Sequence, residues 1–103
     1  MGGFFWKISV ATITFTLFGR SYCHLCDDML QALLTLCADE QVVAAHGQCT
    51  VEQIDVDDDP ELVVLYDELV PVLVGNKEGQ SPVQLCHYFL DHEAVSAFLR
   101  TSG

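Results

Sequence analysis

Residues 12–26 read TITFTLFGRSYCHLC and contain the change of pattern that decides the fold. Residues 12–18 alternate β-branched residues with aromatic or aliphatic ones, which predicts a buried strand. After a short break, apolar residues recur from Leu25 onward at helical spacing, which predicts a helix with a broad apolar face. The pair Cys23 and Cys26 therefore stands where a strand turns into a helix.

The rest of the chain predicts further strands and helices in alternation. The expected elements are strands at 12–18, 50–56, 72–74 and 83–86, and helices at 25–38, 61–68 and 91–99. Asp59 before Pro60 is typical of a helix start, because Asp caps free N–H groups and the φ angle of proline suits the first turn. Residues 75–79 predict a turn, and Leu62 and Leu65 are expected to be buried. The order is β-α-β-α-β-β-α, an α/β domain.

Length and charge exclude several classes of protein. The 103 residues suffice for one domain with a modest core, and the formal net charge is −11. Phosphate contacts need clustered Lys and Arg, so this balance argues against nucleic-acid binding and against an anionic membrane surface. Residues 1–11 are expected to be an N-terminal extension and 12–103 the domain. Because the apolar run near Lys7 lacks a small-residue cleavage site, we favour this interpretation over a targeting segment and expect a cytoplasmic protein.

The spacing of Cys23 and Cys26 indicates metal or redox chemistry in a reducing compartment. On the first turn of a helix, residues three apart lie on one face, and the free N–H groups with the helix dipole stabilise a thiolate on the first cysteine. We therefore expect Cys23 to attack a disulfide and Cys26 to resolve the mixed disulfide. Arg20 and protonated His24 favour the thiolate, whereas the two aspartates after Cys26 oppose it.

Two further features are candidate substrate contacts. Val70 precedes Pro71 at the head of a strand, which could leave its backbone free to pair with a visiting peptide. Proline statistics alone favour an ordinary trans bond here. Tyr22 either lines a substrate groove beside Cys23 or packs against the domain.

The other cysteines are expected to pack. Cys37 lies on the apolar face of the first helix and Cys49 enters a strand, and free cysteine is often buried as a small hydrophobe. Cys86 and His87 could join the pair as soft ligands, but neighbours on a strand point to opposite faces. We therefore predict no metal site.

Three linked motifs carry a family resemblance: YCHLC at 22–26, VDDDPEL at 56–62 and VPVL at 70–73. In this order they resemble the thioredoxin superfamily, and more narrowly the small bacterial glutaredoxin-like proteins. The resemblance extends over residues 14–99. It implies a mixed four-stranded sheet flanked by three helices.

The resemblance also implies a cis Pro71 lying against the cysteines, with Cys23 as nucleophile and Cys26 as resolving thiol. The chain departs from glutaredoxins that use glutathione, which usually carry Thr-Val-Pro and a later Gly-Gly pair. It has Leu69 in place of that threonine, no glycine pair at 84–89, and at best Arg20 as the basic residue that would meet a glutathione carboxylate. It also lacks the Trp-Cys-Gly-Pro-Cys core of thioredoxins. The fold is therefore carried over, but the reductant and substrate are not.

Three hypotheses follow for the function. The leading one is a monomeric thiol–disulfide oxidoreductase without a bound cofactor, which acts on protein or small-molecule disulfides and takes electrons from glutathione or a reductase. The second is an iron–sulfur or metal carrier in which Cys23 is a ligand in a dimer that also uses glutathione. The third is a redox-inert interaction module that keeps only the fold.

Overall fold

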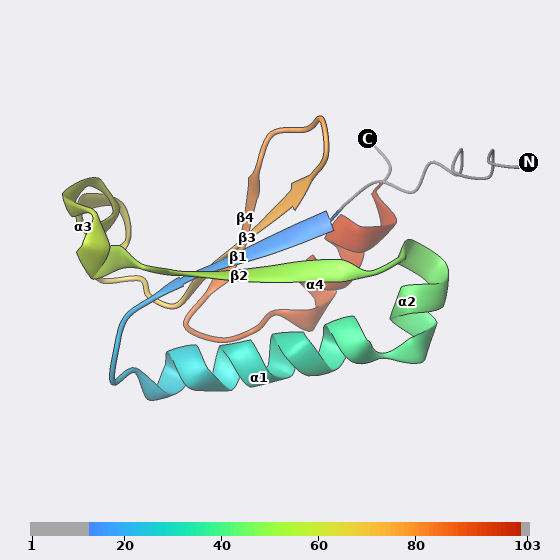
Figure 1. Cartoon of the computed structure of the whole chain (residues 1–103), viewed down its shortest axis with the longest axis horizontal. Coiled ribbons are helices and arrows are strands. Elements are labelled where there is room, and N and C mark those ends of the chain that lie inside the picture. Colours follow the sequence, from blue (N-terminus) through green and yellow to red (C-terminus); the bar gives the residue numbers. More distant parts are fainter. Residues whose placement is uncertain (1–12, 102–103) are drawn as a thin grey trace, which may run out of the picture.

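The structure of this chain is a computed structural model, and it describes residues 13–101 (Figure 1). In chain order the elements are β1 (Ile13–Gly19), α1 (His24–Ala38), α2 (Glu40–His46), β2 (Cys49–Asp55), the 3₁₀ turn η2 (Val56–Asp58), α3 (Pro60–Tyr66), β3 (Val72–Lys77), β4 (Val83–His87) and α4 (His92–Arg100). Apart from the end of β3 and the additional helix α2, the boundaries lie within two residues of those predicted.

The four strands form one mixed sheet in the order β2-β1-β3-β4. β2 runs parallel to β1, whereas β3 is antiparallel to both β1 and β4. The parallel pair needs a long crossover, which the helices between β1 and β2 provide. The mixed four-stranded sheet implied by the resemblance is confirmed.

The hydrophobic core lies between one face of the sheet and two helices, α1 and α4. Alternate residues of β1 point into it, and Phe15 is fully buried with Leu33 of α1, Leu73 of β3 and Val95 of α4. The rings of Phe15 and Phe98 meet with centroids 5.9 Å apart. This packing fixes α1 against β1 and so fixes the junction that carries the cysteines.

The prediction of three helices is wrong, because residues 13–101 form four. α2 begins after Asp39, whose carboxylate accepts hydrogen bonds from the N–H groups of Gln41 at 2.8 Å and Val42 at 3.3 Å. It ends at Gly47, where φ is 82°, a value that favours glycine. These capping signals are present in the sequence, but they enclose a helix of only seven residues.

Two smaller predictions are also wrong. Gly75 belongs to β3 and not to a turn, because it pairs with Phe15 of β1 and Val83 of β4. A Cβ atom at Gly75 would lie 2.7 Å from two carbons of the Phe98 ring. Leu65 is 59% exposed and not buried.

The predicted extension at residues 1–11 lies outside the described residues, so its role stays a prediction. Within residues 13–101 no helix is both long and apolar enough to cross a membrane.

Candidate active site

Cys23 and Cys26 lie at the N-terminal end of α1 and are joined by a disulfide. Cys23 is the N-cap of the helix, with extended backbone angles, and its Sγ accepts a hydrogen bond from the N–H of Cys26 at 3.1 Å. Free N–H groups and the positive end of the helix dipole stabilise negative charge on sulfur at this position. The prediction that the cysteine pair lies where a strand turns into a helix is confirmed. The chemical role of each sulfur stays a prediction.

The two sulfur-bearing residues differ in exposure. Cys26 is only 8% exposed, whereas Cys23 is partly exposed. The Cys26 sulfur lies against Gly19, where an added Cβ atom would stand 2.9 Å from it and 3.3 Å from Cys26 Cβ. An incoming sulfur can therefore reach Cys23 more readily than Cys26. The sequence pattern indicates only that a strand ends near Gly19 and carries no signal for this contact.

Tyr22 and His24, the two neighbours of Cys23, are exposed. Tyr22 has a φ of 57° and its side chain is fully exposed, so the packing alternative for this ring is wrong. His24 is the first residue of α1 and also faces solvent. A substrate contact by Tyr22 and thiolate stabilisation by His24 stay predictions.

The Val70–Pro71 peptide bond is cis, as the resemblance implies and against the expectation from proline statistics. Pro71 is fully buried and precedes β3, whose Val72 pairs with Phe18 of β1. Continuing this antiparallel register by one residue brings Pro71 level with Gly19. Since Gly19 touches the Cys26 sulfur, Pro71 lies at the same end of the sheet as the disulfide.

The backbone of Val70 is only partly free, which corrects the sequence-based expectation. Its N–H donates to the carbonyl of Tyr66 at 3.2 Å. The next carbonyl, that of Pro71, accepts from the N–H of Tyr88 at 2.9 Å, and the Tyr88 hydroxyl donates to the carbonyl of Glu68 at 2.6 Å. Through these two hydrogen bonds Tyr88 holds residues 68–71, the segment before β3, in position. A substrate contact through Val70 or Pro71 stays a prediction.

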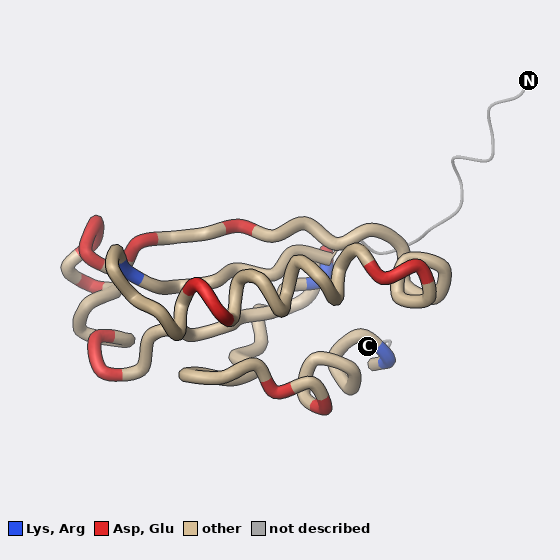
Figure 2. The backbone as a smooth tube through the Cα atoms, turned by 90° about the horizontal axis from the view of Figure 1, so that it is seen from below, with Lys and Arg blue, Asp and Glu red and all other residues tan. Residues whose placement is uncertain are grey.

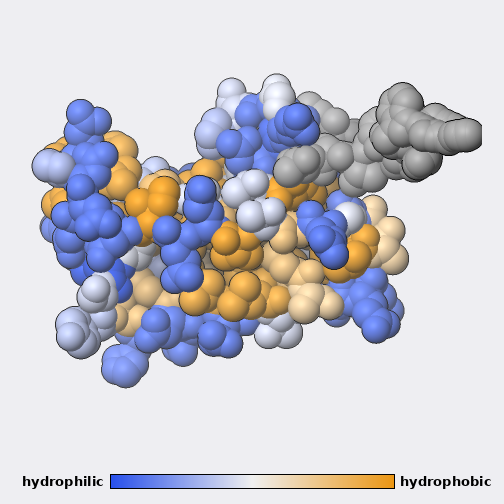
Figure 3. Space-filling model, viewed as in Figure 1, coloured by the Kyte–Doolittle hydropathy of each residue, from blue (hydrophilic) through white to orange (hydrophobic). Residues whose placement is uncertain are grey.

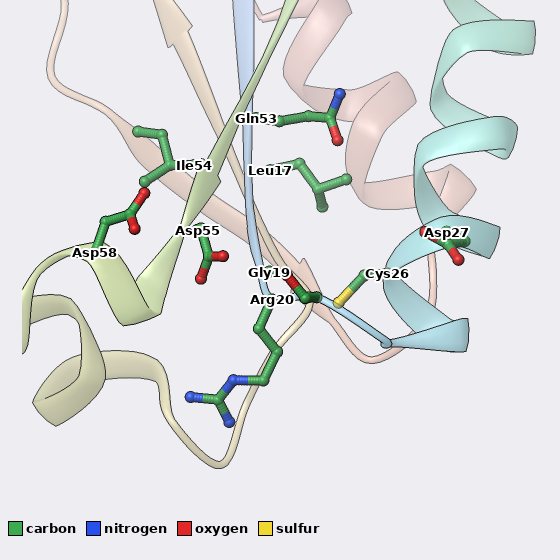
Figure 4. A pocket seen from close by; sticks show the side chains of 10 residues that line it. Leu17, Gly19, Arg20, Cys26, Asp27, Gln53, Ile54, Asp55 and Asp58 are labelled. Carbon is green, nitrogen blue, oxygen red and sulfur yellow. The ribbon is translucent and has the colours of Figure 1, made fainter.

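Arg20 holds together segments that are distant in the sequence. Its Nη2 lies 2.8 Å from Asp67 Oδ1 and 2.9 Å from Asp57 Oδ1. These hydrogen bonds, first to Asp67 and then to Asp57, raise the pKa of the guanidinium. Figure 4 shows the Arg20 side chain pointing away from Cys26. The guanidinium is thus engaged by two carboxylates, and its predicted effect on the thiolate is untested.

A cavity of about 380 Å³ opens beside the disulfide (Figure 4). Its lining includes Cys26, Arg20 and three carboxylates, those of Asp27, Asp55 and Asp58. Because Arg20 is already paired, the charge facing this cavity is negative. Figure 2 shows acidic segments around this end of the molecule, and Figure 3 shows mainly hydrophilic side chains over the α3 end.

The three other cysteines in the chain are free and partly buried, and all pack against the core as predicted. Burial raises the pKa of the Cys37 thiol to about 12, and the neighbouring Cys49 adds to this effect. Burial also raises the pKa values of Cys49 and Cys86. Cys86 packs inward while His87 is exposed, as alternation along a strand predicts. Within residues 13–101 no three His, Cys, Asp or Glu side chains are grouped as metal ligands.

Sequence and structure comparisons show what this chain is similar to. The family model described as "Glutaredoxin-like domain (DUF836)" matches residues 14–100. A search of curated protein sequences found no match. The solution structure of protein Ne2328 from Nitrosomonas europaea is 29% identical with a TM-score of 0.62, over 95% of this chain and 98% of that chain.

Two other solved structures extend the comparison. Target protein XcR50 from X. campestris is 26% identical with a TM-score of 0.56, over 86% of this chain and 99% of that chain. Chloroplastic thioredoxin z is 22% identical with a TM-score of 0.57, over 96% of this chain and 88% of that chain. The likeness to thioredoxin z shows the fold alone.

Proposed function

Because this chain belongs to the glutaredoxin-like domain family, we propose that it is a thiol–disulfide oxidoreductase that cycles Cys23 and Cys26 between dithiol and disulfide. The observation that carries the proposal is the disulfide at the start of α1, with the sulfur of the more exposed cysteine at the helix N-cap. A redox function in general is supported by the family and by this pair. The direction of the reaction and its substrate are part of the proposal.

In the reducing direction, the Cys23 thiolate attacks one sulfur of a substrate disulfide. A new bond forms between Cys23 Sγ and that sulfur, the substrate S–S bond breaks, and the other substrate sulfur leaves as a thiolate. The Cys26 thiolate then attacks Cys23 Sγ and releases the second substrate thiolate. Two electrons have passed to the substrate, the Cys23–Cys26 disulfide remains, and the released thiolates take up protons from solvent.

An external thiol donor must return the two electrons in each cycle. Glutathione or a dithiol reductase can supply them, and the proposed cycle needs no bound organic cofactor. The paired state of Arg20 and the carboxylates of the cavity favour a protein disulfide with basic residues nearby over a small anionic disulfide.

The test is the reduction of a basic model protein disulfide with dithiothreitol as electron donor. Wild-type protein should accelerate the reaction in proportion to its concentration, whereas Cys23→Ser should leave the uncatalysed rate, because the attacking sulfur is gone. Cys86→Ser is the matched control. It removes a cysteine from β4, packed against the core, and should retain the wild-type rate.

Equal rates for the wild type and Cys23→Ser would refute the proposal. Near-ultraviolet circular dichroism of both proteins should agree, which separates loss of chemistry from loss of fold.

A further inference from the structure

A second cavity, of about 400 Å³, lies between α4 and the hairpin of β3 and β4. Its lining is mainly apolar and includes Val83 and Leu85 of β4 with Ala94 and Phe98 of α4. Lys77, the last residue of β3, is the only charged side chain among the described residues that line it. An apolar cavity of this size with a few polar groups is typical of a small-molecule site.

Lys77 is buried although it carries a charge, with only 5% of the residue exposed. Its Nζ donates a hydrogen bond to the carbonyl of Thr101 and lies 4.8 Å from the centre of the Phe98 ring. Both partners line the cavity, so the ammonium group stands at the cavity wall. An ammonium group has three N–H donors, and within residues 13–101 the Thr101 carbonyl is the only acceptor that Lys77 reaches.

The ammonium group of Lys77 has no counter-charge among the acidic side chains. All fifteen Asp and Glu residues lie within residues 13–101, and the ion pairs formed there are those of Arg20 with Asp57 and Asp67. A buried cation without an opposite charge is unfavourable, because only such a charge and further hydrogen bonds offset its loss of hydration. A bound carboxylate would supply both.

The aromatic wall of the cavity is held in place by the core. The Phe98 ring meets the ring of Phe15 with centroids 5.9 Å apart, and it lies where a side chain at Gly75 would be. Val95, on the same helix, is fully buried. The cavity is therefore formed before a ligand arrives, which lowers the cost of binding.

The cavity is remote from the disulfide. Lys77 pairs with Ile13 at the beginning of β1, whereas the Cys26 sulfur lies against Gly19 at the end of this strand. The seven residues of β1 put about 20 Å between these ends, at about 3.3 Å per residue. Figure 1 shows α4 ending near the beginning of β1 and α1 starting beyond its other end. A ligand in this cavity would therefore not touch the active-site cysteines.

We propose that this cavity binds a small carboxylate with an apolar body, such as a medium-chain fatty acid. The carboxylate accepts hydrogen bonds from the remaining N–H donors of Lys77, and the apolar chain lies against Leu85 and Phe98. Because Lys77 is shielded from solvent, this ion pair is screened less than one at the surface. A neutral amide of the same length lacks the ionic contact, and an amine is repelled by the ammonium group.

The experiment titrates octanoate into the full chain at neutral pH and follows the backbone amide signals by NMR. Signals of the β4 and α4 residues that line the cavity should shift and saturate, while those around Cys23 should stay in place. Octanoate should bind at least about tenfold more tightly than octanamide, and octylamine more weakly than octanamide. These comparisons use the wild-type chain and so do not depend on how well a variant folds.

Lys77→Met tests the charge and keeps the length of the side chain. This variant should bind octanoate and octanamide equally, and its affinity for octanamide should stay within about twofold of the wild-type value. Arg100→Gln is the matched control, because it removes an exposed cation from the same helix and changes the net charge equally. It should keep the tenfold preference for octanoate.

Equal affinities of the wild type for octanoate and octanamide would overturn the proposal, as would an equal loss of preference in Lys77→Met and Arg100→Gln. The absence of any saturable shift, as expected if another part of the chain fills the cavity, would overturn it too. Cys23→Ser should bind octanoate as the wild type does, so the result is independent of catalysis at Cys23.

Discussion

The two ends of α1 carry the same side chains in opposite surroundings. At the N-terminal end, Cys23 is partly exposed and its sulfur accepts a hydrogen bond from a backbone N–H. At the C-terminal end, Cys37 is packed against the core, no free N–H group of the helix faces it, and the negative end of the dipole disfavours a thiolate. The comparison teaches that position on the helix, more than residue type, decides how well the surroundings of a cysteine stabilise negative charge on its sulfur.

The sharpest way to break this comparison is to remove Cys26 and, in a separate control variant, a cysteine outside the candidate active site. In Cys26→Ser, the mixed disulfide between Cys23 and substrate has no resolving thiol, so the covalent complex should accumulate. Dithiol-dependent turnover should fall by at least about a hundredfold. Cys49→Ser should turn over substrate at the wild-type rate and trap nothing. Mass spectrometry after acid quenching measures both outcomes, and equal trapping by the two variants would contradict the assignment.

The next largest expected effect is on the alkylation rate of Cys37, which depends on the fraction of this thiol that is ionised. With a pKa of about 12, against an ordinary value of about 9, Cys37 should be alkylated about a thousandfold more slowly than a free thiol at pH 8. The rate should rise tenfold per pH unit until the pH approaches this pKa. Alkylation of the reduced protein with iodoacetamide, resolved by peptide mass, measures it. A rate for Cys37 equal to that of glutathione would show that burial does not protect this thiol.

The raised pKa of Cys37 also makes the stability of the folded protein depend on pH. Above pH 9 the unfolded chain releases the Cys37 proton while the folded protein keeps it, so stability at this residue is lost as the pH rises from about 9 toward 12. Cys37→Ala removes the titrating group. Its unfolding temperature should therefore fall less steeply over this range than that of the wild type.

Crowding at the active-site end gives a smaller effect. In Gly19→Ala, the added methyl group would stand 2.9 Å from the Cys26 sulfur, and relieving the clash should cost about 1–3 kcal/mol. Displacing this sulfur should weaken the disulfide and raise its reduction potential. Gly79→Ala is the control, because nothing lies within 4 Å of its Cβ position and its φ of +83° costs about 1 kcal/mol. If both variants shift the potential equally, contact with Gly19 does not position Cys26.

Short-range sequence patterns predict part of the fold and of the candidate site. The alternation before Gly19, the helical spacing after Cys23 and the cap at Asp59 are short-range signals, and they placed the strands, the first helix and the cysteine pair. The sequence does not predict α2, because Asp39 and Gly47 enclose too few residues to show a periodic apolar pattern.

Long-range contacts could not be derived from such patterns. The ion pairs of Arg20 join residues that are 37 and 47 positions apart in the sequence. The sequence predicts a turn at Gly75, but in the structure the close approach of the Phe98 ring leaves no room for a side chain at this position. Each of these features is set by which elements pack together. The sequence alone therefore predicts the cysteines of the site but not its charged rim, which is Arg20 with Asp57 and Asp67.

The charged rim gives the smallest expected effect, and it concerns rate and not stability. Asp67→Asn removes one carboxylate from Arg20 and leaves its guanidinium less neutralised beside the cavity. Reduction of a basic protein disulfide should slow by about twofold to fivefold at low salt, and reduction of anionic glutathione disulfide should quicken by a similar factor. Both differences should shrink as salt screens the charges.

Glu78→Gln is the matched control, because it removes one exposed carboxylate in the turn between β3 and β4 and so changes the net charge equally. If net charge alone governed encounter, the two variants would respond alike to both substrates. A response confined to Asp67→Asn would place the discrimination at the rim that Arg20 organises beside Cys26. An unchanged ratio of the two rates in Asp67→Asn would mean that the paired state of Arg20 has no part in choosing the substrate.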